Sequence, residues 1–231
     1  EMLVEHIRKM KEATEKTWGI NVPLLYPEID RLMDIIIQEG VKIVFTSAGS
    51  PKKWTPLLKS HGITVVHVIS SALFAKKCEE AGVDAVVAEG FEAGGHNGRE
   101  ETTTLTLIPN VVESCSLPVI AAGGISSGKS VVAAMTLGAE GVQIGTRFAV
   151  ATESSAHPAF KQRVFDTEEG GTMLALKKLA PTRLIKNEFF NQVKALEDAG
   201  AETAQLTELL GKGRAKKGIF EGDMTEGELE I

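Results

Sequence analysis

Short apolar segments alternate with helix-patterned segments through most of the chain, and this alternation limits the fold more than any other feature. Each apolar segment is continuously hydrophobic, which is typical of parallel strands that are buried on both faces. Most of the segments between them carry apolar residues at helical spacing and end at a glycine. The six expected strands cover residues 20–26, 41–49, 63–70, 83–90, 117–124 and 140–148. The sequence therefore predicts an α/β protein with a parallel sheet.

Two parallel architectures fit this alternation, an open doubly wound sheet and a closed (β/α)8 barrel. A barrel needs eight strands in roughly 250 residues, whereas six are expected here and the chain begins in a helix-patterned segment. We expect a TIM (β/α)8 barrel that lacks its first two βα units. Residues 1–150 would form the barrel portion, residues 151–215 a helical excursion or lid with no clear strand except 172–176, and residues 216–231 the start of the return to the final barrel helix.

Composition argues against several classes of function. A net charge of −6 is unlike the basic surface of a nucleic-acid-binding protein. No apolar run approaches the roughly 18 residues that a membrane span needs, and we expect no signal peptide. The two cysteines, Cys78 and Cys115, form no CxxC pair and are too few for a disulfide scaffold. This cysteine usage is typical of the reducing cytoplasm, so we expect a cytoplasmic protein. We also expect no metal site, because the sequence has no HExxH motif and no Cys/His cluster.

Glycines gather where two neighbouring late strands are expected to end. The sequence "AAGGIS" ends one strand with Gly123 and Gly124 and opens a helix at residues 126–127, and "QIGTRF" ends the next strand with Gly145 and Thr146. Backbone N–H groups at such turns and helix starts bind phosphate, and in βα barrels the phosphate pocket follows the last two strands. The simpler alternative is that tight turns between strand and helix need glycine. A P-loop is not indicated, because "GGISSGKS" lacks the required spacing.

The segment "AEGFEAGGHNGREE" (residues 88–101) places His96 among glycines at the end of an expected strand. Glycines allow a sharp bend close to a flat ligand, and an imidazole there can donate to a carbonyl or nitro oxygen or exchange a proton near neutral pH. The alternative is a loop histidine that makes a surface hydrogen bond. Glu89 ends the same buried strand, where an isolated carboxylate is unfavourable, so it should meet N–H donors or a ligand hydroxyl. His67 lies inside a strand, and we expect it in the core or lining it.

Three stretches, "AEGFEAGGHNG", "PVIAAGGI" and "GAEGVQIGTRF", resemble the flavin enzymes of the nitronate monooxygenase (2-nitropropane dioxygenase) family. They are most similar to its branch of flavin-dependent enoyl-acyl-carrier-protein reductases of type II. The resemblance covers residues 19–158 and implies that residues 1–150 are an FMN-binding barrel portion. In the family the first strand carries a Gly-Gly-Met flavin loop. That loop is missing here, so these 231 residues by themselves are expected to bind FMN poorly or not at all.

The resemblance also implies roles for individual residues. His96 matches the active-site histidine of the family. The cofactor contacts comprise a phosphate site on the two glycine-rich strand ends and polar or backbone contacts to the flavin ring or ribityl chain. These are Gly123, Gly124, Gln143, Gly145 and Thr146 for the phosphate, and Asn21, Glu89 and Gly94 for the rest.

Two redox activities remain open from the resemblance. In a reductase, NAD(P)H would reduce FMN, the flavin N5 would pass hydride to the β-carbon of an enoyl thioester, and His96 would orient or protonate the thioester. In a monooxygenase, a nitronate would reduce the flavin, which would then react with oxygen. Glu89 favours the reductase, because the resemblance associates glutamine at this position with the monooxygenases.

A non-redox reading uses the same glycine-rich ends for a phosphorylated substrate. An isomerase or aldolase of this kind would be colourless, whereas a flavoprotein would be yellow. A catalytically inactive remnant is a further alternative. The expected partners are a small-molecule or acyl-carrier-protein-linked substrate and a second copy in a homodimer, with neither nucleic acid nor membrane.

Overall fold

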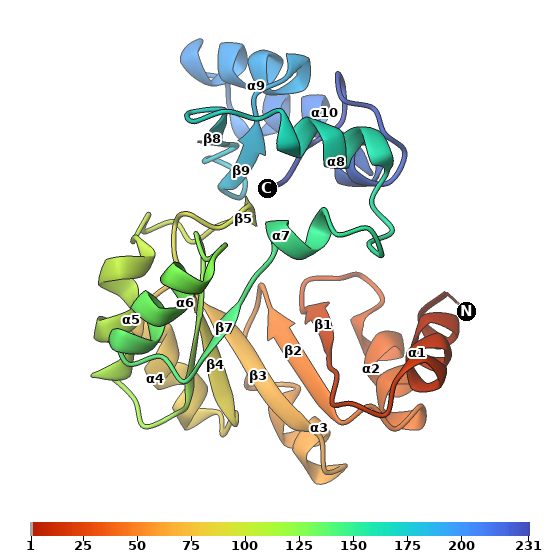
Figure 1. Ribbon diagram of the computed structural model, residues 1–231, viewed down its shortest axis with the longest axis vertical. Coiled ribbons are helices and arrows are strands. Elements are labelled where there is room, and N and C mark those ends of the chain that lie inside the picture. The colour runs from red at the N-terminus through yellow and green to blue at the C-terminus, as the bar shows by residue number, and fades with distance from the viewer. Residues whose placement is uncertain (1) are drawn as a thin grey trace.

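The six expected strands form one parallel sheet in the computed structural model, which describes residues 2–231 (Figure 1). Their order across the sheet is β1-β2-β3-β4-β6-β7, which follows their order in the chain. A doubly wound sheet would reverse its order at a switch point, whereas this unidirectional order matches a βα barrel. The strands are β1 (Ile20–Pro23), β2 (Ile43–Ser47), β3 (Thr64–Ile69), β4 (Ala85–Glu89), β6 (Val119–Ala122) and β7 (Gly141–Gln143).

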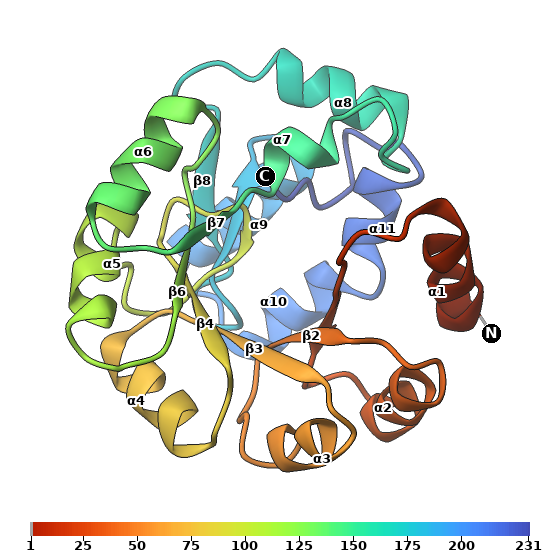
Figure 2. The ribbon, with the colours of Figure 1, turned by 60° about the horizontal axis from the view of Figure 1, so that its bottom comes forward.

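Helices connect the strands and cover the outer face of the curved sheet (Figure 2). Within the described residues β1 and β7 are the two edges of the sheet and do not pair with each other, so the strands form an open arc of a barrel. The α/β prediction with barrel-type order is confirmed. The helices of this part are α1 (Met2–Ala13), α2 (Ile29–Gln38), α3 (Thr55–Ser60), α4 (Ala72–Glu80), α5 (Thr104–Val112) and α6 (Gly128–Thr136).

Buried valines on both faces of the sheet explain why the strand segments are continuously apolar. Val44, Val65 and Val86 belong to the core that also contains the apolar faces of the helices. Val66 and Val87 belong to a smaller cluster on the concave face. Burying one such side chain stabilises the fold by roughly 1.5–3 kcal/mol. Because both faces of the sheet are covered, the strand residues do not alternate between apolar and polar.

Residues after β7 form a second part of the molecule, which lies above the carboxyl ends of the strands in Figure 1. Two of its strands, β8 (Thr172–Ala175) and β9 (Thr182–Ile185), join β5 (Gly95–His96) in an antiparallel sheet of order β5-β9-β8. The helices of the second part are α7 (Thr146–Ala149), α8 (Pro158–Phe165), α9 (Glu188–Asp198), α10 (Thr203–Leu210) and α11 (Arg214–Ile219).

The expected helical excursion at residues 151–215 contains the helices α8, α9 and α10 and also a β-hairpin. Segment 172–176 holds β8, as the sequence suggested, but β9 was not expected. The strand β9 is four residues long and its other partner, β5, comes from a distant part of the chain, so no local pattern marks it. Residues 216–231 contain the end of α11, turns and an extended segment that bridges β9 at Glu230, and their assignment to a return toward the final barrel helix stays a prediction. The domain limits at residues 150 and 215 stay predictions.

The loop between β4 and α5 connects the two parts. Besides the β5–β9 pairing, the Asn97 N–H donates to the Pro181 carbonyl oxygen over 2.7 Å. The Arg99 guanidinium donates to the carbonyl oxygens of Lys177 and Leu179, at 3.2 and 2.7 Å. The second part therefore holds this loop in place above the carboxyl end of β4.

Candidate active site

A cavity of about 380 Å³ opens at the carboxyl ends of β4, β6 and β7, beneath the second part of the molecule. The strand register explains its composition, because Glu89 lies beside Ala122 and Ala122 lies beside Gln143 on adjacent strands. Seven of the nine site residues predicted from the sequence line this cavity. They are Glu89, Gly94, Gly123, Gly124, Gln143, Gly145 and Thr146.

The other two predicted residues, Asn21 and His96, do not line the cavity. Asn21 is level with Phe45 across the sheet, and the register then passes through Val66 to Ala85, four residues before Glu89. Asn21 is on the concave face of β1, which β2 and β3 separate from β4, and its side chain is exposed. His96 is exposed on β5, two residues after the lining residue Gly94.

The glycines of the cavity fall into two kinds. Gly123 and Gly124 have φ angles of +97° and +67°, and a Cβ on Gly123 would lie 2.7 Å from the Gly90 carbonyl oxygen. The backbone therefore requires glycine there, which agrees with the simpler alternative that tight turns between strand and helix need glycine. Gly145 differs, because a Cβ would meet no atom within 4 Å. Its missing side chain leaves open space in the cavity wall, which suits a bound group.

The start of α6 is less available to an anion than the sequence suggested. The helix begins at Gly128, and Ser127 is its N-cap residue. The backbone N–H groups of Ser126 and Ser127 both donate to the Ser130 hydroxyl, at 3.1 and 3.0 Å. These two donors are satisfied within the chain, so a phosphate would rely on the backbone around Gly124 and Gly145.

Comparison with known proteins places the chain in a family. The sequence profile described as nitronate monooxygenase matches residues 4–230. The chain belongs to the nitronate monooxygenase family. A probable nitronate monooxygenase of Staphylococcus saprophyticus is 33% identical over 93% of this chain and 66% of its own length. A (3aS,4S,5R,7aS)-5-hydroxy-7a-methyl-1-oxo-octahydro-1H-indene-4-carboxyl-CoA dehydrogenase of Rhodococcus jostii is 36% identical over 67% of this chain and 43% of its own length.

Two solved structures share the fold. FabK from Thermotoga maritima superposes with a TM-score of 0.93 at 37% identity, over 99% of this chain and 72% of FabK. A nitroalkane oxidase from Streptomyces ansochromogenes superposes with a TM-score of 0.81 at 25% identity, over 98% of this chain and 77% of the oxidase. The chain spans about two thirds or less of the length of the curated relatives described above.

Glu89 is the most perturbed carboxyl group of the barrel part of this family member. Burial raises its pKa to about 7 from an ordinary value of 4.5. In the described residues its carboxyl group has no hydrogen-bond or ion-pair partner within the chain. A carboxyl group that is protonated near neutral pH can donate a hydrogen bond as well as accept one. It is therefore suited to a ligand that presents carbonyl, ring-nitrogen or hydroxyl groups.

Sequence reasoning did not select Glu92 or Glu230, which also line the cavity. The Glu92 carboxylate accepts hydrogen bonds from the Thr104 N–H and hydroxyl, at 2.8 and 2.9 Å, and so ties the loop to the start of α5. Its place in the glycine-rich loop could have indicated this role. Glu230 reaches the cavity only through tertiary pairing with β9, which no local pattern signals.

The Asn97 side chain organises the loop around His96. Its amide nitrogen donates to the carbonyl oxygens of Ala93 and Gly95, at 2.8 and 3.1 Å. Its Oδ1 is buried and, among the described residues, has no hydrogen-bond partner. An unsatisfied acceptor of this kind is unfavourable unless a donor from outside the chain reaches it.

The remaining candidate groups have structural roles. His67 is buried, its Nδ1 lies 2.6 Å from the Thr46 hydroxyl, and burial lowers its pKa to about 4 although a hydrogen bond with the Gly49 backbone opposes the shift. Burial raises the pKa of the Cys78 thiol to about 12. Within residues 2–231 we find no group of three or more His, Cys, Asp or Glu side chains placed to hold a metal ion. None of the described helices is long and apolar enough to cross a membrane.

Proposed function

We propose that the chain belongs to an FMN-dependent oxidoreductase that reduces an enoyl thioester with NAD(P)H, in the manner of an enoyl-acyl-carrier-protein reductase II. The observation that carries the proposal is the cavity at the strand ends, with open space at Gly145 and a carboxyl group of raised pKa at Glu89. The similarity to FabK, an enoyl-acyl-carrier-protein reductase II, supports an enoyl-acyl-carrier-protein substrate. The carboxyl-CoA dehydrogenase supports a thioester substrate more generally.

The two ends of the cavity suit different parts of FMN. The strands β4 and β7 are separated by β6, so their ends are roughly 10 Å apart at the usual spacing of neighbouring strands. At the β7 end, Gly145, Thr146 and Arg147 offer backbone groups, a hydroxyl and a cation to a phosphate. At the β4 end, Glu89 offers a carboxyl group to the ring or the ribityl hydroxyls. The residues present therefore fit the cofactor.

In this proposal His96 acts on the substrate. When bound, FMN supplies the hydride-transfer chemistry that protein side chains lack. The chain's own contribution is to bind and orient the thioester and to supply a proton. The exposed imidazole, two residues from the lining residue Gly94, can donate to the thioester carbonyl oxygen or give up a proton near neutral pH.

A nitronate monooxygenase is the second candidate function. The matched family profile and the staphylococcal relative carry this description, and the nitroalkane oxidase shares the fold. In that case His96 would contact the nitro group of a nitronate. Glu89 favours the reductase through the resemblance alone, which associates glutamine at this position with the monooxygenases, because a protonated carboxyl group would also tolerate an anionic nitronate.

Parallel assays on the full-length protein test these alternatives. Protein purified with FMN should be yellow and should oxidise NAD(P)H only when an enoyl thioester such as crotonyl-CoA is present under anaerobic conditions. Oxygen uptake with a nitronate and without NAD(P)H would instead support the monooxygenase. A protein that remains colourless and binds no FMN would contradict both and favour a non-redox phosphate-binding enzyme.

A histidine pair supplies the matched control. His96→Ala is expected to lower kcat by about a hundredfold or more, the usual contribution of a general acid or base. His6→Ala removes an exposed imidazole from α1, far from the cavity, and should leave the rate unchanged. Equal rates for His96→Ala and wild type in both assays would exclude the proposed role. We also expect a cytoplasmic homodimer, and light scattering on the purified protein tests the dimer.

A further inference from the structure

We propose that Glu230 is a positioning residue for His96, and this inference rests on the proposed function of the cavity. Glu230 lies on the extended segment that follows α11, and it lines the same cavity as Glu89. Its carboxylate would lie beside the loop that carries the imidazole. It would hold the ring in one orientation and balance the charge that the ring gains on protonation.

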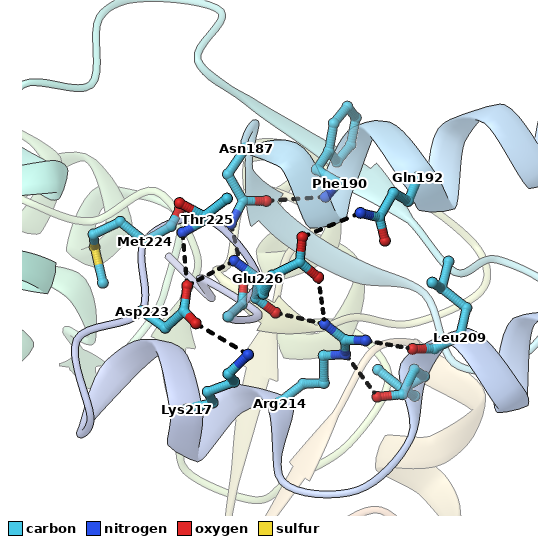
Figure 3. Close-up of polar contacts among 12 residues, drawn as sticks. Asn187, Phe190, Gln192, Leu209, Arg214, Lys217, Asp223, Met224, Thr225 and Glu226 are labelled. Carbon is cyan, nitrogen blue, oxygen red and sulfur yellow. Dashed lines mark hydrogen bonds and ion pairs between the residues drawn. The ribbon is translucent and has the colours of Figure 1, made fainter.

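The segment that carries Glu230 is fixed by contacts within the second part (Figure 3). The Arg214 guanidinium donates to the Glu226 carbonyl oxygen over 2.7 Å and pairs with its carboxylate at 3.1 Å. The Asn187 amide donates to the carbonyl oxygens of Met224 and Gly227, at 3.1 and 2.9 Å. The segment is therefore anchored immediately before it reaches the cavity.

The pairing with β9 brings Glu230 next to the histidine loop. The residues Thr182 and Arg183 of β9 pair with β5, and the next residue, Leu184, bridges Glu230. The Ile185 N–H continues this pairing by donating to the Leu229 carbonyl oxygen over 2.9 Å. The loop and the segment thus lie end to end along one edge of β9.

The contact between the loop and the segment depends on glycine. Gly95, the residue before His96, has a φ of +72°, and a Cβ on it would lie 2.7 Å from Oε2 of Glu230. A Cβ on Gly94 would lie 1.9 Å from the backbone of Ile231. Only residues without a side chain allow the carboxylate to come this close to the backbone of the histidine loop.

Among the charged groups around Glu230, His96 is the one that favours its ionised form. No ion pair or side-chain hydrogen bond fixes the Glu230 carboxylate within the described residues. Burial raises the pKa of Glu230, and the interaction with His96 opposes that shift by favouring the ionised form. The other charged groups nearby are Glu228 on the same segment, Arg183 on β9, and the cavity residues Glu89, Glu92 and Arg147.

A carboxylate beside an imidazole has a defined chemical effect. It stabilises the protonated ring and selects one ring orientation by accepting an N–H hydrogen bond. Such a partner raises the fraction of enzyme molecules whose imidazole is ready to act, so its loss lowers kcat more than it raises KM.

Steady-state kinetics on the full-length FMN-loaded protein test this role. Glu230→Gln keeps the size of the side chain and removes its charge, and we expect kcat to fall about tenfold or more, the loss usual for a partner that orients a histidine, with KM changed less than twofold. Glu230→Asp should recover part of the lost kcat. The matched control is Glu221→Gln, which removes an exposed carboxylate that pairs with Lys216 and is not part of the anchor. It should leave kcat within twofold of wild type.

Infrared spectroscopy provides a readout that does not depend on activity. The carbonyl band of protonated Glu230 is assigned by its loss in Glu230→Gln, and its titration is followed with pH. In His96→Gln the band should persist to higher pH, because the imidazole no longer favours the ionised carboxylate. An unchanged titration would overturn the inference even if the enzyme is active. Inactivity of the wild type with both substrates would instead overturn the proposed function and leave this test valid.

Discussion

Glu89→Gln should make the protein more stable above neutral pH and equally stable in acid. Burial raises the pKa of Glu89 to about 7 from 4.5, so the folded state binds this proton more tightly than the unfolded chain does. Below pH 4.5 the group is protonated in both states, and above pH 7 it is ionised in both. The free energy of unfolding therefore falls as pH rises between these values.

The size of the effect follows from the same two values. Their difference, at about 1.4 kcal/mol per pH unit, corresponds to about 3 kcal/mol, an upper value because the open cavity leaves the carboxylate some contact with water. Glutamine carries no charge, so near pH 8 the variant should be more stable by up to about 3 kcal/mol and should melt higher by about 6–12 °C.

Urea unfolding followed by circular dichroism at a series of pH values measures this difference. Glu140→Gln is a suitable control, because it removes a carboxylate from an exposed position. The pH dependence should shrink in Glu89→Gln without vanishing, since burial and the neighbouring Glu230 also raise the pKa of Glu228 to about 7. If wild type and Glu89→Gln show parallel pH curves, Glu89 is not held in a desolvated site, and its proposed contact with a cofactor loses its physical basis.

Two further predictions concern the second part of the molecule. Phe189→Ala removes a fully buried ring that lies 4.6 Å from the Arg214 guanidinium, and it should lower the unfolding free energy by about 3–5 kcal/mol in urea. Asp223→Asn should destabilise the protein at neutral pH but not in strong acid. The Glu226 N–H and the Lys217 ammonium hold the pKa of Asp223 near 2, so its stabilisation is present at neutral pH and is lost as pH falls toward 2. A gap between variant and wild type that stayed constant down to acid pH would contradict that assignment.

The barrel part could be predicted from sequence because its information is local. Each strand is short and buried on both faces, so a continuous apolar run marks it without reference to its neighbours. Helix starts also depend on local residues, as with Ser71, whose side chain caps α4, and His157, which caps α8 by accepting from the Ala159 N–H. The strand β9 lacked such a signal, since its four residues become a strand only by pairing with β5 and β8.

The candidate site also contains residues that local sequence signals predict and residues whose place depends on tertiary structure. Strand-end residues such as Glu89, Gly124 and Gly145 were predicted to lie together because the carboxyl ends of neighbouring parallel strands meet at one edge. Asn21 lies on β1, which β2 and β3 separate from β4, and it is not among the residues that line the cavity. Periodicity reports which face of the sheet a residue occupies, whereas the residues beside it depend on the order and register of the strands, which sequence alone does not give.

The arrangement around His96 shows why the second part matters to the chemistry of the first. The Asn97 side chain forms a hydrogen bond within the loop that carries the imidazole. Glu92 accepts a hydrogen bond from the first residue of α5, and β5 pairs with β9. A side chain can be exposed to meet a substrate and still be precisely oriented only if its backbone is rigid. That rigidity comes from both parts of the molecule, because β9 and the Glu230 segment reach the loop from the side opposite the barrel strands. Loosening the second part should therefore weaken catalysis at His96 even when the cofactor cavity at the strand ends stays intact.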